Sequence, residues 1–354
     1  MKKEKQICKS VVVVLFLLGG FTNPTKGQHA ITYECNAIRA EDSLLVELVD
    51  YAEAYGIGEN QIWDFSGQRA YKSFMLRYLA DTLDIIRCID YGFNVNYKEQ
   101  EKQQMICSKE DPQNTMNYQL PVMSLNYPMH LGDSVSDSFC GEGKYCGRFF
   151  SRNLGIRSIK ADASGSIILE EGDTLRNALR IHTYIETDIR MNTDSCANDT
   201  DRNVRERTDL YRWYVRGCRY PVFESARSVL AYNDSVISTT ETSRRMLPEW
   251  QFTGDDEANQ TLLENEEGME ESNFCYQLEY EGNHVRITYD LKVRSTLKLI
   301  IADISGMVYR SESQTNEAGQ GYILDLDCSS LRRGHYVVYI NVNGKIYNSK
   351  IEVI

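Results

Sequence analysis

The feature that most constrains the fold of this chain is a period-two alternation of apolar and polar residues near its C-terminus. Residues 285–289, 297–301 and 322–326 each place apolar side chains at every second position. Successive residues of a strand point to opposite faces, so this period is typical of half-buried β-strands. Asn343-Gly344 separates two further apolar runs and predicts a tight hairpin. Residues 274–354 are therefore predicted to form a small immunoglobulin-like antiparallel β-sandwich.

The larger part of the chain, residues 28–253, is also predicted to be mainly β, as a large sandwich-like domain. Residues 161–170 and 174–187 flank a turn with Gly172 at its centre, which indicates a hairpin. A second hairpin is indicated by the runs on either side of Arg216-Gly217. The chain has 23 Tyr and 6 Pro, and aromatic residues favour strands.

Two segments of this part stay ambiguous, and one boundary is clear. Residues 44–51 and 94–105 suit either a strand or a helix by propensity. Residues 254–273 hold eight acidic residues, no Lys or Arg, and few apolar residues. Such a segment repels itself and lacks core material, so an acidic linker is predicted between the two β-rich parts.

Residues 1–27 are predicted to be a cleaved signal peptide. A Lys-rich start precedes the apolar run 11–18, and small or polar residues follow it. We therefore expect an exported protein in the periplasm, on the outer-membrane surface or outside the cell. The run 11–18 is shorter than the roughly 20 apolar residues that a membrane-spanning helix needs, and no later segment approaches that length. Removing residues 1–27 takes the net charge from −12 to −16, which disfavours nucleic acid as a partner.

The cysteines leave two alternatives open. Export permits disulfides, and Cys140 and Cys146 form the one close pair. The glycines between them would let that loop close, so a local disulfide is one interpretation. Metal binding is the weaker one, because no His lies nearby and the spacing does not match a zinc site. We expect no metal and no cofactor.

No catalytic residue is identified from the sequence. The five His residues are spread singly, no Gly-x-Ser-x-Gly motif occurs, and no glycine loop for phosphates follows a strand. The one basic and aromatic cluster contains Arg212, Trp213, Tyr214 and Arg216. Such a cluster either binds sugars or cations, or packs across the strands of a hairpin.

A resemblance covers residues 274–354. Residues 297–308 read Leu-Lys-Leu-Ile-Ile-Ala-Asp-Ile-Ser-Gly-Met-Val, and residues 331–345 begin Leu-Arg-Arg-Gly-His-Tyr. With these stretches the segment resembles the type IX secretion sorting domain (type A) of Bacteroidetes, without that family's opening Pro-Asn-Pro. The motif residues are Asp303 and Gly306 of an Asp-x-x-Gly turn, and Gly334 and Tyr336 of Gly-x-Tyr. The resemblance implies secretion or surface attachment, with secretion machinery as a partner.

The middle of the chain resembles a group of uncharacterised exported proteins of Bacteroides and its relatives. The stretches that carry this are Trp-Asp-Phe-Ser (63–66), Gly-Glu-Gly-Lys-Tyr-Cys (141–146) and Tyr-Arg-Trp-Tyr (211–214). The resemblance implies a bacterial envelope habitat and no particular chemistry. Our interpretation is an exported, non-enzymatic protein whose large domain serves binding or adhesion, with a cell-surface glycan as a candidate partner. The alternative is a cell-surface hydrolase acting on glycans or peptides. The oligomeric state stays open.

Overall fold

The computed structural model describes residues 30–82, 84–170, 173–192, 204–248, 251, 274–343 and 345–353. The predicted signal peptide (1–27) and acidic linker (254–273) lie outside the described residues. The elements are α1 (Tyr33–Asn36), β1 (Ser43–Val49), β2 (Gly58–Asp64), β3 (Ala70–Thr82), β4 (Ile85–Asp90), β5 (Phe93–Gln100), β6 (Gln103–Glu110), β7 (Asn114–Asn126), β8 (Ser134–Tyr145), β9 (Phe149–Glu170), β10 (Asp173–Asn192), β11 (Val204–Val215), β12 (Phe223–Tyr232), β13 (Ser235–Met246), β14 (Cys275–Glu281), β15 (His284–Leu291), β16 (Ser295–Asp303), β17 (Val308–Asn316), β18 (Gly319–Asp327), β19 (Gly334–Val342) and β20 (Lys345–Val353).

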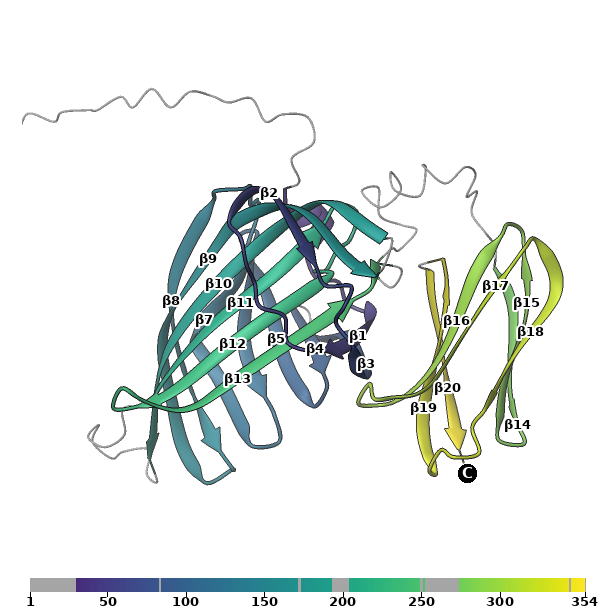
Figure 1. Ribbon diagram of the computed structural model, residues 1–354. Helices are drawn as coiled ribbons and strands as arrows, with labels where there is room; N and C mark the ends of the chain where they lie inside the picture. The colour runs from purple at the N-terminus through teal and green to yellow at the C-terminus, as the bar shows by residue number, and fades with distance from the viewer. Residues whose placement is uncertain are drawn as a thin grey trace, which may run out of the picture.

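The first thirteen strands form one sheet that closes on itself (Figure 1). Neighbouring strands pair antiparallel in chain order from β3 to β13, and β1 lies between β13 and β3. The seam between β1 and β13 is short and runs from Val46 opposite Met246 to Val49 opposite Ser243. Among the described strands of this sheet, β2 alone stands apart from the ring, pairing parallel with β9. The other described strands of the sheet, twelve in number, form a closed barrel.

The prediction of a mainly β chain is confirmed, but the sandwich-like architecture predicted for residues 28–253 is wrong. Both predicted hairpins exist within the barrel. Thr174 pairs with Ile168 across β9 and β10, and Trp213 pairs with Phe223 across β11 and β12. Hairpins of this kind occur in sandwiches and barrels alike. What separates the two folds is the pairing of the first strand with the last, which lie almost 200 residues apart and share no local sequence pattern.

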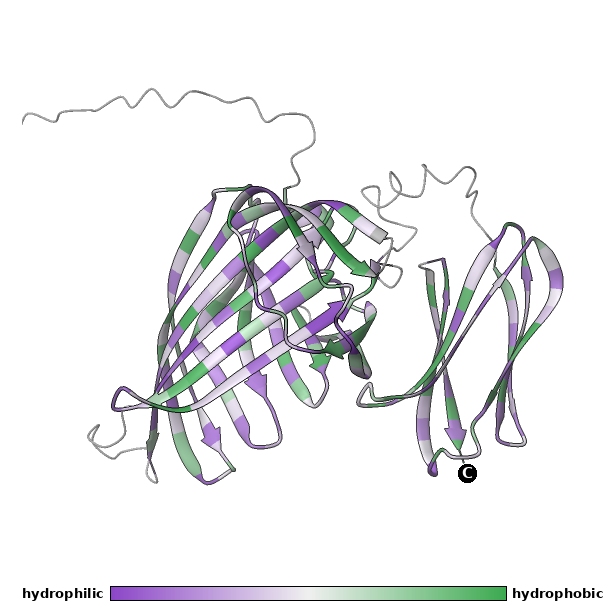
Figure 2. Cartoon of the chain, viewed as in Figure 1, coloured by the Kyte–Doolittle hydropathy of each residue, from purple (hydrophilic) through white to green (hydrophobic). Residues whose placement is uncertain are grey.

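The outer wall of the barrel is largely polar, and hydrophilic and hydrophobic residues alternate along its strands (Figure 2). On β10 and β11, exposed charges pair across the strands. Arg205 lies 3.0 Å from Asp188, Arg207 lies 3.0 Å from Glu186, and the His182 ring lies 2.7 Å from Asp209. Residues opposite each other on neighbouring strands share a face, so all of these charged residues lie on the outer face. The residues between them on β10 and β11 therefore point into the barrel.

Residues 50–69, which include β2, cover one patch of this outer wall and are called the strap below. Trp63 and Phe65 of the strap meet Trp213 of β11 edge to face, at ring-centroid distances of 5.8 and 5.2 Å. Arg180 of β10 is 1% exposed beneath the strap. Its guanidinium donates to Asp162, 2.8 Å away, and to the carbonyl oxygens of Tyr55 and Gly56. The strap therefore buries an apolar and charged patch that would otherwise face water.

Residues 274–353 form two smaller antiparallel sheets packed on one core. One has the order β14-β15-β18 and the other β17-β16-β19-β20. The alternating apolar residues of 285–289 and 297–301 face each other in that core. The predicted hairpin at Asn343 is confirmed, because Val342 pairs with Lys345.

The second sheet also packs against the barrel. Ile300, Val337 and Tyr339, on its outer face, contact Leu45 and Met75 of the barrel. The backbone N–H of Met75 donates to the carbonyl of Gly306, and Phe74 forms an isolated bridge with Met307. Strands buried on both faces have continuous apolar runs rather than an alternation. This explains why residues 299–302 and 337–340 are apolar throughout.

Candidate functional site

Residues 30–42, called the N-terminal segment below, cross the end of the barrel at which β3 ends and β4 begins. Ile31 pairs with Met129, and the Tyr127 hydroxyl donates to the carbonyl of Asn36 over 3.0 Å. On the other side of the barrel, the Asn36 side chain donates to the carbonyls of Cys218 and Arg219, each at 3.1 Å. Thr32 caps α1, since its side chain accepts from the backbone N–H of Cys35. These anchors fix α1 across the barrel end.

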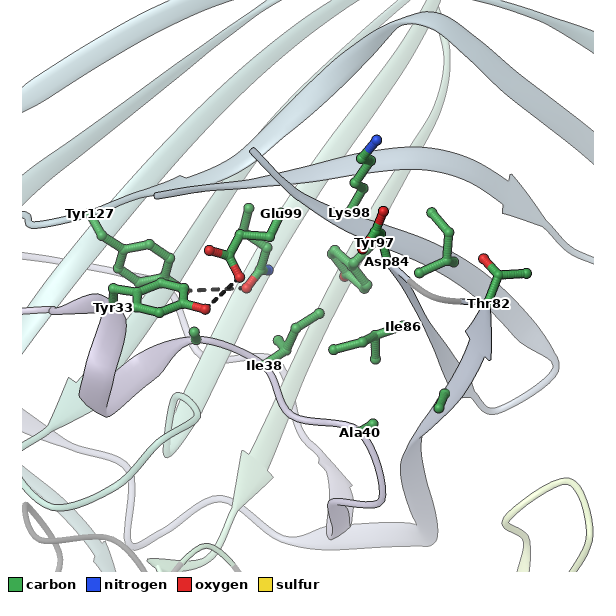
Figure 3. Close-up of a pocket in the computed structure, with 14 residues that line it drawn as sticks. Tyr33, Ile38, Ala40, Thr82, Asp84, Ile86, Tyr97, Lys98, Glu99 and Tyr127 are labelled. Atoms are coloured by element: carbon green, nitrogen blue, oxygen red, sulfur yellow. Dashed lines mark hydrogen bonds between the residues drawn. The ribbon is translucent and has the colours of Figure 1, made fainter. Parts of the chain in front are cut away.

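A pocket of about 580 Å³ lies between this segment and the strand ends (Figure 3). That size is typical of small-molecule sites. Three of its residues are tyrosines, four are charged or amide residues, and the rest are mainly aliphatic. The lining residues are Tyr33, Ala37, Ile38, Ala40, Ala80, Thr82, Asp84, Ile85, Ile86, Tyr97, Lys98, Glu99, Gln104 and Tyr127.

Two polar contacts organise one side of the pocket. The Tyr33 hydroxyl donates to Glu99 Oε2 over 2.5 Å, and the Tyr127 hydroxyl, which donates to Asn36, lies 3.3 Å from Gln104 Oε1. The bond to Glu99, with burial, raises the pKa of Tyr33 above 10.0, and burial raises the pKa of Tyr97. Burial likewise raises the pKa of Tyr127 well above its usual value. All three tyrosines therefore stay protonated at neutral pH and offer ring faces and hydroxyl groups to a ligand.

The residue types of the pocket are compatible with binding and with acid–base chemistry. Its lining contains no Ser, Cys or His, but Thr82, Lys98 and two carboxylates are groups that can act as nucleophiles or bases. Asp84 and Glu99 supply two carboxylates, which is the equipment of glycoside hydrolysis. Aromatic faces beside a few convergent polar groups are typical of sites for small polar ligands.

Deeper in the barrel, a network of charged side chains crosses the interior. Glu224 of β12 lies 2.8 Å from Arg212 and 2.5 Å from Arg244, and Arg244 lies 2.7 Å from Asp90. Tyr97 lines both this region and the pocket above. The barrel interior therefore contains buried ion pairs beside its apolar clusters.

The basic and aromatic cluster predicted from the sequence is divided by the barrel wall. Arg212 and Tyr214 face the interior, where Arg212 pairs with Glu224. Trp213 faces outward and is covered by the strap, so it serves packing. Arg216 is exposed in the turn after β11. The four residues form no common binding surface.

The fold does not bring Cys140 and Cys146 together. Both are free, with Cys140 inside β8 and Cys146 directly after its end. Six residues of extended strand span about 20 Å, whereas the Cα atoms of a disulfide lie roughly 4.4–6.8 Å apart. Among the described residues, no group of three or more His, Cys, Asp or Glu side chains is placed to hold a metal ion.

The motif residues of the sorting-domain resemblance stabilise turns of the smaller domain. Asp303 Oδ1 accepts from the backbone N–H of Ser305 and Met307, at 2.8 and 3.1 Å. Gly306 has φ of +92°, and a Cβ there would collide with the carbonyl of Met75, so the turn that meets the barrel requires glycine. Gly334 opens β19, and the buried Tyr336 donates to the carbonyl of Arg332 over 2.8 Å.

Sequence reasoning missed the pocket residues because no local motif unites them. Tyr33, Tyr97 and Tyr127 come from α1, β5 and the segment after β7. The high tyrosine content was the single hint, and it was interpreted as strand propensity.

No family model matches this chain, and no curated protein shows significant similarity to it. Within the described residues, no helix has the length and apolar character needed to cross a membrane.

Proposed function

We propose that this chain is an exported, non-catalytic binding protein whose barrel holds a small polar ligand in the pocket beneath α1. The observation that carries this proposal is the pocket of about 580 Å³, fixed on one side by the anchored N-terminal segment and lined by three tyrosines. A saccharide unit suits this lining. Its C–H faces would lie on tyrosine rings, and its hydroxyls would bond to Glu99, Gln104 or Lys98.

The immunoglobulin-like C-terminal domain is proposed to serve secretion or surface attachment, as its resemblance implies. Its docking against β3 leaves the β14-β15-β18 sheet away from the barrel (Figure 1). Fractionation of the cells that make the protein tests where the whole chain is located. We expect the chain in the envelope or the medium, without its first 27 residues. An intact chain in the cytosol would overturn the proposed export.

Binding to the pocket is tested with a Glu99→Gln variant on a glycan array, followed by calorimetry on the best glycan. Loss of the charged acceptor should weaken binding about tenfold, because hydrogen bonds to charged groups are worth roughly 1.5–3 kcal/mol. Glu110→Gln, at the exposed end of β6, is the matched control and should bind like the wild type. If the wild type and both variants bind the glycan equally, the glycan does not bind in this pocket.

The rival hydrolase is favoured by one observation, the two carboxylates of Asp84 and Glu99 in the same pocket. The same glycan samples distinguish the two functions. New reducing ends that disappear in the Glu99→Gln variant would establish hydrolysis, whereas retention without cleavage supports binding.

A further inference from the structure

Among the described residues, one buried cation of the barrel interior, Arg157, forms no ion pair. Arg157 of β9 is 3% exposed, and its Nε has no hydrogen-bond partner among the described residues. It shares a face with Asp137 of β8 and Ile185 of β10, directly opposite it on either side. Asp137 Oδ1 instead accepts from the backbone N–H of Ser138, and no carboxylate of the described residues forms an ion pair with Arg157. Burying an unpaired charge is costly, so this arrangement is a candidate ligand site.

A second cation lies on the same inner face of the sheet, since Lys109 of β6 is opposite Met116, two residues from the inward-facing Tyr118 of β7. Lys109 of β6 is accessible to water, yet burial and the charge of Arg157 lower its pKa from 10.5 to about 8. Both observations hold if its ammonium group faces a water-accessible lumen enclosed by protein. Burial and Arg212 likewise lower the pKa of Arg157 to about 9. The carboxylate of Glu206 raises the pKa of Lys109 in part, against these effects. Glu206 Oε1 accepts a hydrogen bond from the Ser228 hydroxyl at 3.0 Å.

Two other cations of the barrel interior, by contrast, have carboxylate partners. Arg212 and Arg244, on the neighbouring part of the wall, share Glu224, and Arg244 also pairs with Asp90. Within the part of the chain that the structure describes, these two buried cations are therefore compensated, whereas Arg157 and Lys109 form no ion pair with a carboxylate.

Neutral donors lie on the same inner face. Tyr118 packs edge to face on Phe139 at 5.9 Å, two residues along β8 from Asp137, the residue opposite Arg157. Burial raises the pKa values of Tyr118 and of the inward-facing Tyr214 to about 12, so both keep their protons. Thr183 Oγ1, on the strand next to Arg157, is also buried and finds no hydrogen-bond partner among the residues that the structure describes. An apolar cluster of Ile106, Val122, Phe139 and Ile185 adjoins Tyr118.

We propose that the barrel lumen binds the oxyanion group of a small ligand, a carboxylate or a phosphate, with Arg157 as its main partner and Lys109 and Tyr118 as further donors. An anion there would pair with the two cations, and the adjoining apolar cluster would hold the ligand's hydrocarbon part. This site uses none of the residues tested in the α1 pocket, so it stands or fails independently of the proposed glycan binding.

The test measures binding of inorganic phosphate, acetate and octanoate to the full chain by calorimetry, at constant ionic strength. Arg157→Met should weaken binding of the preferred anion at least tenfold, whereas Arg152→Gln, on the exposed face of the same strand, should leave it unchanged. Preference for octanoate over acetate assigns the site to an amphipathic carboxylate, and preference for phosphate assigns it to a phosphorylated ligand. No binding at millimolar concentration, or equal binding by both variants, overturns the proposal.

A second measurement covers the folding of the variant. Without ligand, Arg157→Met should unfold at an equal or higher denaturant concentration than the wild type, because it removes an uncompensated charge. A clear loss of stability would show that Arg157 pairs within the protein, with Asp137 as its partner, and would contradict the site.

Discussion

Replacing Arg180 by Met should lower the free energy of unfolding by about 3–5 kcal/mol, the usual cost of breaking a buried ion pair from one side. Its guanidinium holds Asp162 at 2.8 and 2.9 Å and donates to two carbonyl oxygens of the strap. It also lies over the rings of Tyr211, Trp63 and Trp213, at 5.0, 5.5 and 5.8 Å. The variant leaves the Asp162 carboxylate, 9% exposed, without its counter-charge. Chemical denaturation measures the loss.

The second substitution Asp162→Asn serves as the control. Combined with Arg180→Met it removes the stranded charge, so the double variant should regain part of the stability. Hydrogen exchange should accelerate at residues 50–57 in the single variant, because the carbonyls of Tyr55 and Gly56 lose their donor. A loss below 1 kcal/mol, with unchanged exchange in the strap, would show that Arg180 does not hold it.

Replacing Glu224 by Gln should cost about 3 kcal/mol, because Arg212 and Arg244 then lose the one carboxylate they share. This expected loss lies at the low end of the roughly 3–5 kcal/mol usual for a broken buried ion pair. The reason is that Arg244 keeps its pair with Asp90 and remains about a quarter exposed. Denaturation of the variant measures it. Glu241→Gln, which breaks an exposed pair with Arg227 on the outer wall, is the matched control and should shift the midpoint little. Equal effects of the two substitutions would contradict a buried network.

Glu224 also makes the stability of the protein depend on pH in the acid range. Burial alone would raise the pKa of Glu224, but Arg244 and Arg212 outweigh it, so the pKa lies below 4.5. A carboxylate with a depressed pKa contributes stability above its unfolded pKa, and that contribution is lost as the pH falls through its folded pKa. The wild type should therefore lose stability below about pH 4.5, and Glu224→Gln should lose less of it there.

The strands were largely predictable from the sequence. Period two over residues 285–301 gave the core of the smaller domain, and turn residues placed three hairpins. Residues 94–105 stayed ambiguous because their turn lies at Glu101-Lys102, two residues that take positive φ without glycine. Turn chemistry is visible in a sequence mainly where Gly, Asn or Asp supply it.

Barrel closure was not predictable in the same way. Alternation shows that one face of a strand is buried, but it does not say what buries it. Here Arg157 and Glu224 face inward, while Trp213 faces outward beneath the strap. Hydropathy would therefore assign the faces of these strands incorrectly. The pocket depends on the same long-range pairing, since its tyrosines meet only after the barrel closes.

The pKa of Lys109 shows directly whether the twelve described strands of the barrel enclose a water-accessible lumen with uncompensated positive charge. It can be followed by nuclear magnetic resonance on isotopically labelled lysine side chains during a pH titration of the ligand-free protein. The enclosed lumen predicts a value of about 8, from burial and the neighbouring Arg157. A value near the ordinary 10.5 would place the ammonium group in bulk water and contradict it.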